Sequence, residues 1–258
     1  MTNKPIVFFD LDGTLLNENK EIPKTAIDAI KKLKEKGVFV ALATGRAPYM
    51  FYEIRKMLEI DTFVSFNGQY VVHKNEVIFK NPLNSIELDK ISECALKSGI
   101  PVAFMTHEQT KANMEYHPHM AESLGTLKHY LPPFDPKFHL NNEIYQSLLF
   151  VSSENEHLFI NNYKEFNFIR WHNYSVDIVP NGGSKAKGIE KVIEMLGSSI
   201  NDVYAFGDGL NDIEMLETVG TGIAMGNAHE NLKKVANHIT FHVDEDGIYK
   251  GLKHFNLI

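Results

Sequence analysis

The chain of 258 residues has one cysteine, Cys94, one tryptophan, Trp171, and only three arginines. A single cysteine cannot close an internal disulfide, which excludes a disulfide-stabilised secreted scaffold and favours a reducing compartment. The N-terminal segment has neither the apolar run nor the small-residue cleavage site of a secretory signal. We therefore expect a cytoplasmic protein.

Long apolar runs and an excess of basic charge are also missing. No stretch reaches about 18 apolar residues, the length of a membrane-spanning helix, so we expect no membrane partner. There are 33 acidic against 26 basic residues, a formal net charge of −7. Such a balance gives no general attraction for a phosphate backbone, so we expect no nucleic-acid partner. A monomer is the default expectation for the oligomeric state, with a homodimer left open.

The first third of the chain alternates apolar strands with helices. Strands are predicted at residues 6–9, 38–43 and 62–66, with one helix starting near Pro23 and another following Pro48. Proline is favoured in the first turn of a helix and cannot continue one. Nearly continuous apolar strands separated by helices are typical of a parallel sheet that is covered on both faces.

The last third returns to the same pattern. We predict a helix at 184–196, a strand at 203–206, a helix through Met215 and Leu216, a strand at 222–225, a helix at 232–236 and a strand at 239–241. Residues 1–82 and 181–258 are therefore expected to form one discontinuous core with a parallel sheet.

The middle of the chain, residues 83–180, differs from the rest in composition and in its predicted order of elements. It holds seven of the 12 histidines and the only tryptophan. Its elements are predicted in the order helix, two strands, helix, strand, helix, two strands, which indicates an α+β unit with an antiparallel sheet. The predicted fold class is therefore α/β, with a parallel-sheet core interrupted by a smaller α+β domain.

Two carboxylates, Asp10 and Asp12, directly follow the first predicted strand. Side chains two residues apart at a strand end lie on the same side, so these repel unless a cation or a proton intervenes. This cost suggests that one carboxylate attacks and the other handles a proton. A surface turn is the plainer alternative. A calcium loop is excluded, because its fifth and sixth positions would be Thr14 and Leu15.

Two other polar clusters also follow predicted strands: Thr44 with Gly45, and Asp208 with Asn211 and Asp212. In an open α/β sheet the carboxyl ends of the strands form the rim where ligands bind. Carboxylates gathered there call for a hard divalent cation, and oxygen ligands favour magnesium. The alternative for Asp208 and Asp212 is helix capping.

Lys185 is expected in the first turn of a helix, directly after the cap residue Ser184. A cation there opposes the helix dipole, and a phosphoryl group would supply the missing partner. The alternative is a solvated lysine, which is also our expectation for Lys187. Thr44 and the amides around Gly45 are suited to the same anion. Arg46 could reach a phosphate or lie at the surface.

These segments together resemble the haloacid dehalogenase-like phosphohydrolases. Residues 10–14 match the first motif of that family, Thr44 the second, Lys185 the third and residues 207–212 the fourth. Residues 43–46, 67–68, 224–228 and 246–248 resemble the Cof-type group, subfamily IIB, whose α+β cap lies between the second and third motifs. The resemblance implies a Rossmann-like core with residues 83–180 as a cap that selects the substrate.

The resemblance also implies roles for the site residues. Asp10 would attack phosphorus to form an aspartyl-phosphate, and Asp12 would act as general acid and base. Mg²⁺ would be held by Asp10, the backbone carbonyl of Asp12 and Asp208. Asp212 would act through a metal-bound water or by orienting Lys185. The phosphoryl oxygens would be bound by Thr44, Gly45, Lys185 and Asn211.

The activity implied is hydrolysis of a small phosphorylated metabolite, a sugar phosphate or a phosphorylated cofactor or precursor. Rival interpretations are a phosphoacceptor switch, a sugar phosphomutase and a protein that senses a phosphorylated metabolite. Five residues of the middle segment could contact the substrate or simply pack: His117, His119, Arg170, Trp171 and His172. Two histidines without a clear third ligand make a weak metal site.

Overall fold

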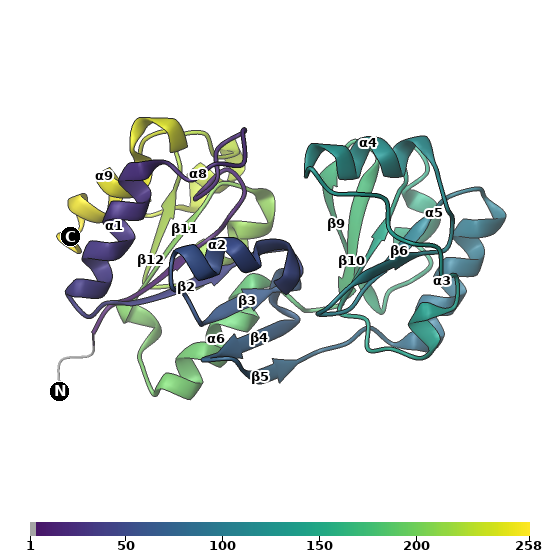
Figure 1. The fold of residues 1–258 in the computed structure, drawn as a ribbon, viewed down its shortest axis with the longest axis horizontal. Coiled ribbons are helices and arrows are strands. Elements are labelled where there is room, and N and C mark those ends of the chain that lie inside the picture. The colour runs from purple at the N-terminus through teal and green to yellow at the C-terminus, as the bar shows by residue number, and fades with distance from the viewer. Residues whose placement is uncertain (1–3) are drawn as a thin grey trace. The chain divides into compact units, whose positions relative to one another are not determined.

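The computed structural model describes residues 4–258, which form two compact units. One unit contains the described residues up to Arg46 together with 51–79 and 184–258, and the other contains residues 47–50 and 80–183. The second unit therefore includes the whole of the predicted insert, residues 83–180. Figure 1 shows helices and strands mixed in both units, and the predicted α/β class is confirmed.

The first unit is built on an eight-stranded sheet with the order β13-β12-β11-β1-β2-β3-β4-β5. Its strands are β1 (Ile6–Phe9), β2 (Phe39–Ala43), β3 (Phe63–Ser65), β4 (Tyr70–His73), β5 (Glu76–Lys80), β11 (Val203–Gly207), β12 (Thr221–Ala224) and β13 (His238–Ile239).

The strands from β13 to β3 are parallel, and β4 runs antiparallel to β3. Ile6 pairs with Phe39 of β2 on one side and with Val203 of β11 on the other. Every side chain of β1 is buried, as expected of an apolar strand covered on both faces. The chain leaves β1 toward β2 and later returns on the opposite side at β11, which makes the β1–β11 boundary a topological switch point.

Six helices cover this sheet: α1 (Lys24–Glu35), α2 (Tyr52–Met57), α6 (Lys185–Leu196), α7 (Ile213–Thr218), α8 (Glu230–Val235) and α9 (Gly247–His254). Helix α1 packs against α9 (Figure 1), and α6 packs against α7. The chain moves in opposite directions from β1 to β2 and from β11 to β12. Right-handed crossovers therefore put α1 and α7 on opposite faces of the sheet.

The ends of α6 follow from its sequence. The hydroxyl of Ser184 accepts a hydrogen bond from the backbone N–H of Lys187, as an N-cap does. Gly197 ends the helix in the left-handed conformation at φ 62°, which a glycine adopts without strain. These ends place Lys185 at the first helical position, as predicted.

The second unit contains a five-stranded antiparallel sheet with the order β7-β6-β8-β10-β9. Its elements are α3 (Ser85–Lys97), β6 (Val102–Met105), β7 (Thr110–Ala112), α4 (Pro118–Thr126), β8 (Gln146–Leu149), α5 (His157–Ile160), β9 (Phe166–His172) and β10 (Ser175–Pro180). Their order is the predicted one, and they enclose an apolar core of their own that includes Leu88, Phe104 and Ile178.

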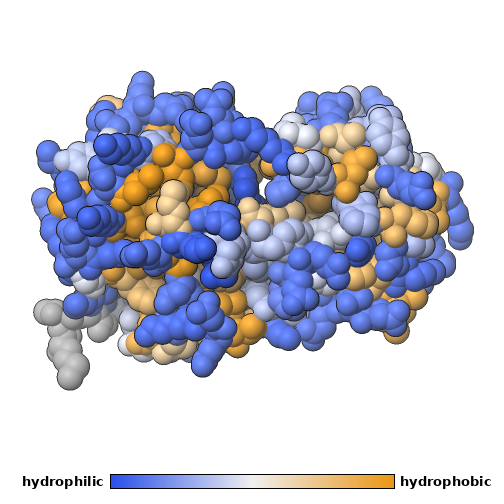
Figure 2. Space-filling model, in the orientation of Figure 1, coloured by the Kyte–Doolittle hydropathy of each residue, from blue (hydrophilic) through white to orange (hydrophobic). Residues whose placement is uncertain are grey.

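The face drawn in Figure 2 is hydrophilic over most of its area, with apolar side chains exposed in smaller patches. Within residues 4–258, none of the helices combines the length and the apolar character needed to cross a membrane.

Candidate active site

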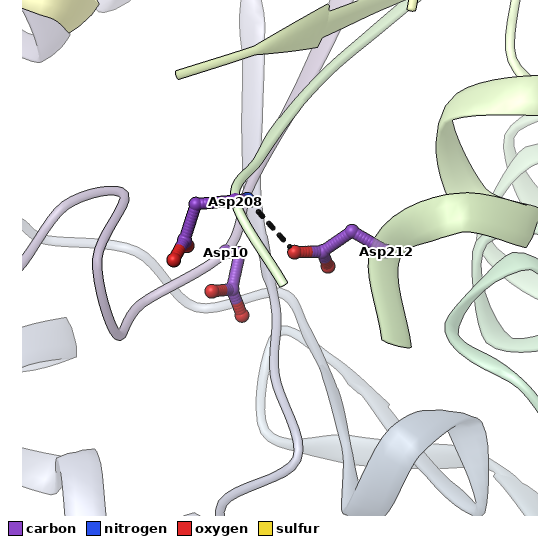
Figure 3. Close-up of side chains that lie close together, drawn as sticks. All are labelled: Asp10, Asp208 and Asp212. Atoms are coloured by element: carbon purple, nitrogen blue, oxygen red, sulfur yellow. Dashed lines mark hydrogen bonds between the residues drawn. The ribbon is translucent and has the colours of Figure 1, made fainter. Parts of the chain in front are cut away.

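Three carboxylates meet at the carboxyl ends of β1 and β11. One oxygen from each of Asp10, Asp208 and Asp212 lies within 4.8 Å of the other two (Figure 3). Asp10 directly follows β1, Asp208 directly follows β11, and Asp212 ends the short turn before α7. The β1–β11 pairing therefore brings together side chains that are nearly two hundred residues apart in sequence.

Lys185 lies between two of these carboxylates. Its Nζ donates to Oδ1 of Asp10 at 2.6 Å and to Oδ1 of Asp212 at 2.7 Å, and its side chain is 1% exposed. Burial lowers the pKa of Lys185, but the two carboxylates outweigh it, so the pKa is raised and the ammonium stays charged. The lysine is therefore not solvated, and its partners are carboxylates of the protein itself, which corrects the expectation that it lacked one.

The carboxylates crowd one another, and this changes their proton affinity. Burial, together with the charges of Asp212 and Asp208, raises the pKa of Asp10 well above its usual range, although Lys185 opposes this. Burial and the charge of Asp212 raise the pKa of Asp208 to about 7. A divalent cation would favour the ionised forms of both. The donor set, three carboxylates without a sulfur or imidazole ligand, could hold a hard metal ion.

Asp212 both closes the turn before α7 and binds Lys185, two roles that the sequence left as alternatives. Its Oδ2 accepts hydrogen bonds from the backbone N–H groups of Asp208 at 3.0 Å and Gly209 at 2.9 Å, which closes the turn before α7. Its Oδ1 binds Lys185. The Asp208 side chain does not cap this helix, because its Oδ1 accepts from the hydroxyl of Thr14 at 2.7 Å.

Gly13 allows the loop after β1 to pass directly beside Asp208. Its φ is +79°, and a Cβ at this position would lie 2.1 Å from Oδ2 of Asp208. The carbonyl oxygen of Gly13 accepts from Nδ2 of Asn227 at 2.7 Å, which fixes the loop from the other side. Only glycine fits a left-handed position with a carboxylate at this distance.

Asp12 has partners that the sequence did not identify. Nε of Arg46 donates to Oδ2 and Nη2 to Oδ1, both at 2.7 Å, and Nζ of Lys20 donates to Oδ1 at 2.7 Å. Burial raises the pKa of Asp12, but the hydrogen bonds and charges of Arg46 and Lys20 outweigh it and lower the pKa to about 2. Arg46 is 10% exposed, so in this structure it is bound to Asp12 and does not lie at the surface.

Thr44, Gly45 and Asn211 lie around one further residue, Asn67. The backbone N–H of Asn67 donates to the carbonyl of Thr44 at 3.1 Å, and Oδ1 of Asn67 accepts from Nδ2 of Asn211 at 3.0 Å. A Cβ on Gly45 would lie 3.1 Å from the Asn67 amide. Sequence reasoning included Asn67 only as part of a family segment. Its position just after a strand, where polar residues reach the rim of the sheet, could have identified it from the sequence.

Two of the residues of the second unit that could contact a substrate, Arg170 and His117, have structural partners. Arg170 binds Oε2 of Glu156 through Nε and Nη2, at 2.8 and 2.6 Å, and also backbone carbonyls. His117 caps α4 by accepting from the N–H of His119. Among residues 4–258 only the aspartate triad gathers three metal-donor side chains, so His117 and His119 gain no third ligand.

The sequence and the fold identify the family. A family model of haloacid dehalogenase-like hydrolases matches residues 7–252, and the chain belongs to this family. A solved structure described as the HAD subclass IIB sugar phosphatase BT4131 has a TM-score of 0.90 and 30% sequence identity. That match covers 99% of this chain and 100% of the other. The chain is therefore an enzyme of the haloacid dehalogenase-like phosphatases.

Two Bacillus subtilis (strain 168) proteins are similar over their full lengths. YkrA is 44% identical over 253 residues, which span 98% of each chain. YitU, named as a 5-amino-6-(5-phospho-D-ribitylamino)uracil phosphatase, is 30% identical over 275 residues, which span 99% of each chain.

Proposed function

We propose that this enzyme is a Mg²⁺-dependent phosphatase that hydrolyses small phosphate monoesters through an aspartyl-phosphate on Asp10. The observation that carries the proposal is the triad of Asp10, Asp208 and Asp212 with Lys185 buried between two of its members. It provides a nucleophile, a place for a cation and a fixed positive charge beside the reacting atom.

Attack on phosphorus requires the ionised form of Asp10. Lys185 favours that form, whereas burial and the neighbouring carboxylates oppose it. The proposed Mg²⁺ ligands are the side chains of Asp10 and Asp208 and the backbone carbonyl of Asp12, with Asp212 acting through a water or through Lys185. The ion would supply positive charge that offsets the carboxylates and stabilises negative charge on the transferring phosphoryl group.

Asp12 is the proposed general acid and base. It would donate a proton to the departing alcohol oxygen and then accept one from the water that attacks the aspartyl-phosphate. With a pKa of about 2, Asp12 as held by Arg46 is ionised, which is the form that the second task requires. The first task requires a protonated Asp12, so at least part of its contact with Arg46 and Lys20 must open before the alcohol leaves.

The phosphoryl oxygens would be bound by Thr44, the Gly45 backbone, Lys185 and Asn211. These donors belong to the loop after β2, the start of α6 and the turn after β11. Donors fixed before the substrate arrives stabilise developing charge without reorganising during the reaction.

Residues 83–180, which lie in the second unit, are the proposed cap that selects the alcohol part of the ester. The substrates named for the relatives, a sugar phosphate for BT4131 and a phosphorylated ribitylamino uracil for YitU, support a small phosphorylated metabolite as the substrate. A single cysteine suits a cytoplasmic setting. We propose a monomer, since catalysis as described needs residues of one chain.

The test is release of inorganic phosphate from p-nitrophenyl phosphate and from a panel of sugar phosphates and phosphorylated cofactor precursors. Each ester is measured with Mg²⁺ and with a chelator. The proposal predicts turnover that the chelator abolishes. Conversion of a sugar phosphate to an isomer without phosphate release would instead identify a mutase. A stable phosphoprotein without turnover would identify a switch, and binding without any reaction would identify a sensor.

A further inference from the structure

The turn Phe66–Gly68 touches all three segments that are proposed to bind the phosphoryl group. It directly follows β3, and its Asn67 contacts both Thr44 and Asn211. A Cβ on Gly68 would lie 1.9 Å from the carbonyl oxygen of Ser184, the residue that caps the helix of Lys185. The turn therefore lies in contact with the loop after β2, the turn after β11 and the start of α6.

The backbone of this turn is strained. Phe66 and Asn67 both have a φ of 52°, in the left-handed region, and Gly68 has a φ of 100°. Left-handed backbone is unfavourable for a residue other than glycine and persists only where the surroundings impose it. Asparagine tolerates this region better than most residues, but phenylalanine has no such advantage. The site therefore maintains an unfavourable turn at this position.

The Asn67 side chain connects two of the phosphoryl-binding segments. It is 1% exposed, and its Oδ1 accepts from Nδ2 of Asn211 at 3.0 Å. The same amide lies against the backbone of Gly45, close enough that a Cβ there would be 3.1 Å from both Oδ1 and Nδ2. One hydrogen on the Asn211 amide nitrogen is engaged by Asn67, which leaves the other to be offered to an anion.

We infer that Asn67 is a positioning residue that fixes the Asn211 amide and the Gly45 backbone in the arrangement that binds the phosphoryl group. The inference rests on the proposed function, because it takes those two residues as phosphoryl donors. The contacts that carry the inference join Asn67 to Thr44, Gly45 and Asn211. The effect of Asn67 is on how well phosphate is bound, through donors that it holds in place.

A purely structural role for Asn67 makes the opposite prediction for one variant. Glycine accepts the left-handed backbone more easily than asparagine, so Asn67→Gly relieves the strain while it removes the side chain. If the turn alone mattered, that variant would be at least as stable as the wild type and equally active. If the amide positions the donors, the variant keeps its stability and loses phosphate affinity.

Asn75 provides a matched control. It is also left-handed, at φ 67°, but it is exposed and lies between β4 and β5, outside the site. Asn75→Gly makes the same chemical change and relieves the same kind of strain. It is expected to leave KM, kcat and phosphate affinity at their wild-type values.

The experiment measures two properties of wild type, Asn67→Gly and Asn75→Gly. One is steady-state hydrolysis of p-nitrophenyl phosphate with Mg²⁺, and the other is calorimetric binding of inorganic phosphate, which needs no turnover. For Asn67→Gly we expect an unchanged or higher melting temperature, and KM and the phosphate dissociation constant raised roughly 10-fold, the equivalent of one hydrogen bond. Wild-type values of both constants in this variant would overturn the inference.

A double-mutant cycle tests whether Asn67 acts through Asn211. Asn67→Gly in an Asn211→Ala background is expected to lower phosphate affinity by less than it does in the wild type, because one of the two donors that Asn67 positions is gone. Fully additive losses would overturn the inference. A wild type that binds phosphate but hydrolyses no ester would refute the proposed function, and the binding data would still decide the role of Asn67. A wild type that binds no phosphate would refute both.

Discussion

Arg46 holds Asp12 by a two-pronged salt bridge, in which Nε donates to one carboxylate oxygen and Nη2 to the other, each at 2.7 Å. With Lys20 on the same carboxylate, this contact lowers the pKa of Asp12 to about 2. In this state Asp12 is ionised, so it can accept a proton but has none to donate. The proposed mechanism therefore divides the reaction into a step that needs the contact opened and a step that does not.

Asp12→Asn is expected to separate those steps. p-Nitrophenolate leaves without help from an acid, so the variant can still form the aspartyl-phosphate from that ester, but no base then activates water. We expect a burst of about one p-nitrophenol per enzyme, followed by turnover reduced roughly 100-fold or more. Stopped-flow absorbance measures both phases. With an alkyl phosphate no burst is expected, and equal losses for the two esters without a burst would contradict the assigned role.

Stability in the presence of a chelator is expected to fall as pH rises from about 4 to about 7. Asp208 has a pKa of about 7 in the fold, against about 4 for an unfolded carboxyl, so the folded state binds this proton more tightly. Its contribution is complete below the unfolded pKa and is lost as pH rises through the folded one. Asp10 acts in the same direction. The pKa of Asp12 is lowered, so its effect on stability lies below about pH 4.

Urea unfolding across this pH range measures the effect. Asp208→Asn is expected to flatten the slope, and Mg²⁺ is expected to restore stability most at the upper end, where the carboxylates are ionised. A chelated wild type whose stability rises steadily from pH 4 to 7 would contradict the assigned proton affinities.

Lys185→Met is expected to be costly to both stability and activity. It leaves Asp10 and Asp212 buried without their shared cation, a kind of loss that destabilises proteins by about 3–5 kcal/mol. Removing a charge beside the reacting phosphoryl group should also reduce kcat by at least about 100-fold. Lys187→Met is the control, because that side chain is 54% exposed and should change stability by no more than about 0.5 kcal/mol. Similar stability losses for the two variants would contradict this account.

Gly13→Ala is expected to disturb the proposed metal site more than the fold. Both Gly13 and Gly197 have a positive φ, at 79° and 62°, so alanine strains the backbone at either position. Only at Gly13 would the added methyl meet a carboxylate, that of Asp208, because nothing lies within 4 Å of the corresponding point at Gly197. Isothermal titration with Mg²⁺ should show weaker binding for Gly13→Ala and wild-type binding for Gly197→Ala.

Much of the architecture was predictable because its signals are local. The apolar strand 6–9, the capped helix that starts at Lys185 and the predicted element order of residues 83–180 all agree with the structure. The hairpin of β4 and β5 and helix α9 were missed. The pair Asn67–Gly68 between β3 and β4 indicates a turn but not the strands that follow it, and α9 is only eight residues long. Short elements of this kind depend on packing against their neighbours more than on their own sequence.

The site was predictable in its residue types but not in its pairings. Strand ends indicated which polar residues meet at the rim of the sheet. Lys185 could not be assigned to Asp10 and Asp212, and Arg46 could not be assigned to Asp12, because these ion pairs depend on register and side-chain direction across distant segments. The contact of Asn67 with Asn211 spans 144 positions. The pair Asn67–Gly68 favours a turn with positive φ, but it does not indicate which distant side chain the turn meets.

The most direct test is to trap the phosphoryl group on Asp10. Phosphorus-labelled p-nitrophenyl phosphate is mixed with Asp12→Asn and Mg²⁺, quenched in acid and digested for peptide mapping. We predict about one label per enzyme on the peptide that contains Asp10, released by hydroxylamine as an acyl phosphate is, and no label in Asp10→Asn. Phosphate release in the first turnover without any labelled protein, or a label on another residue, would contradict the nucleophilic role of Asp10.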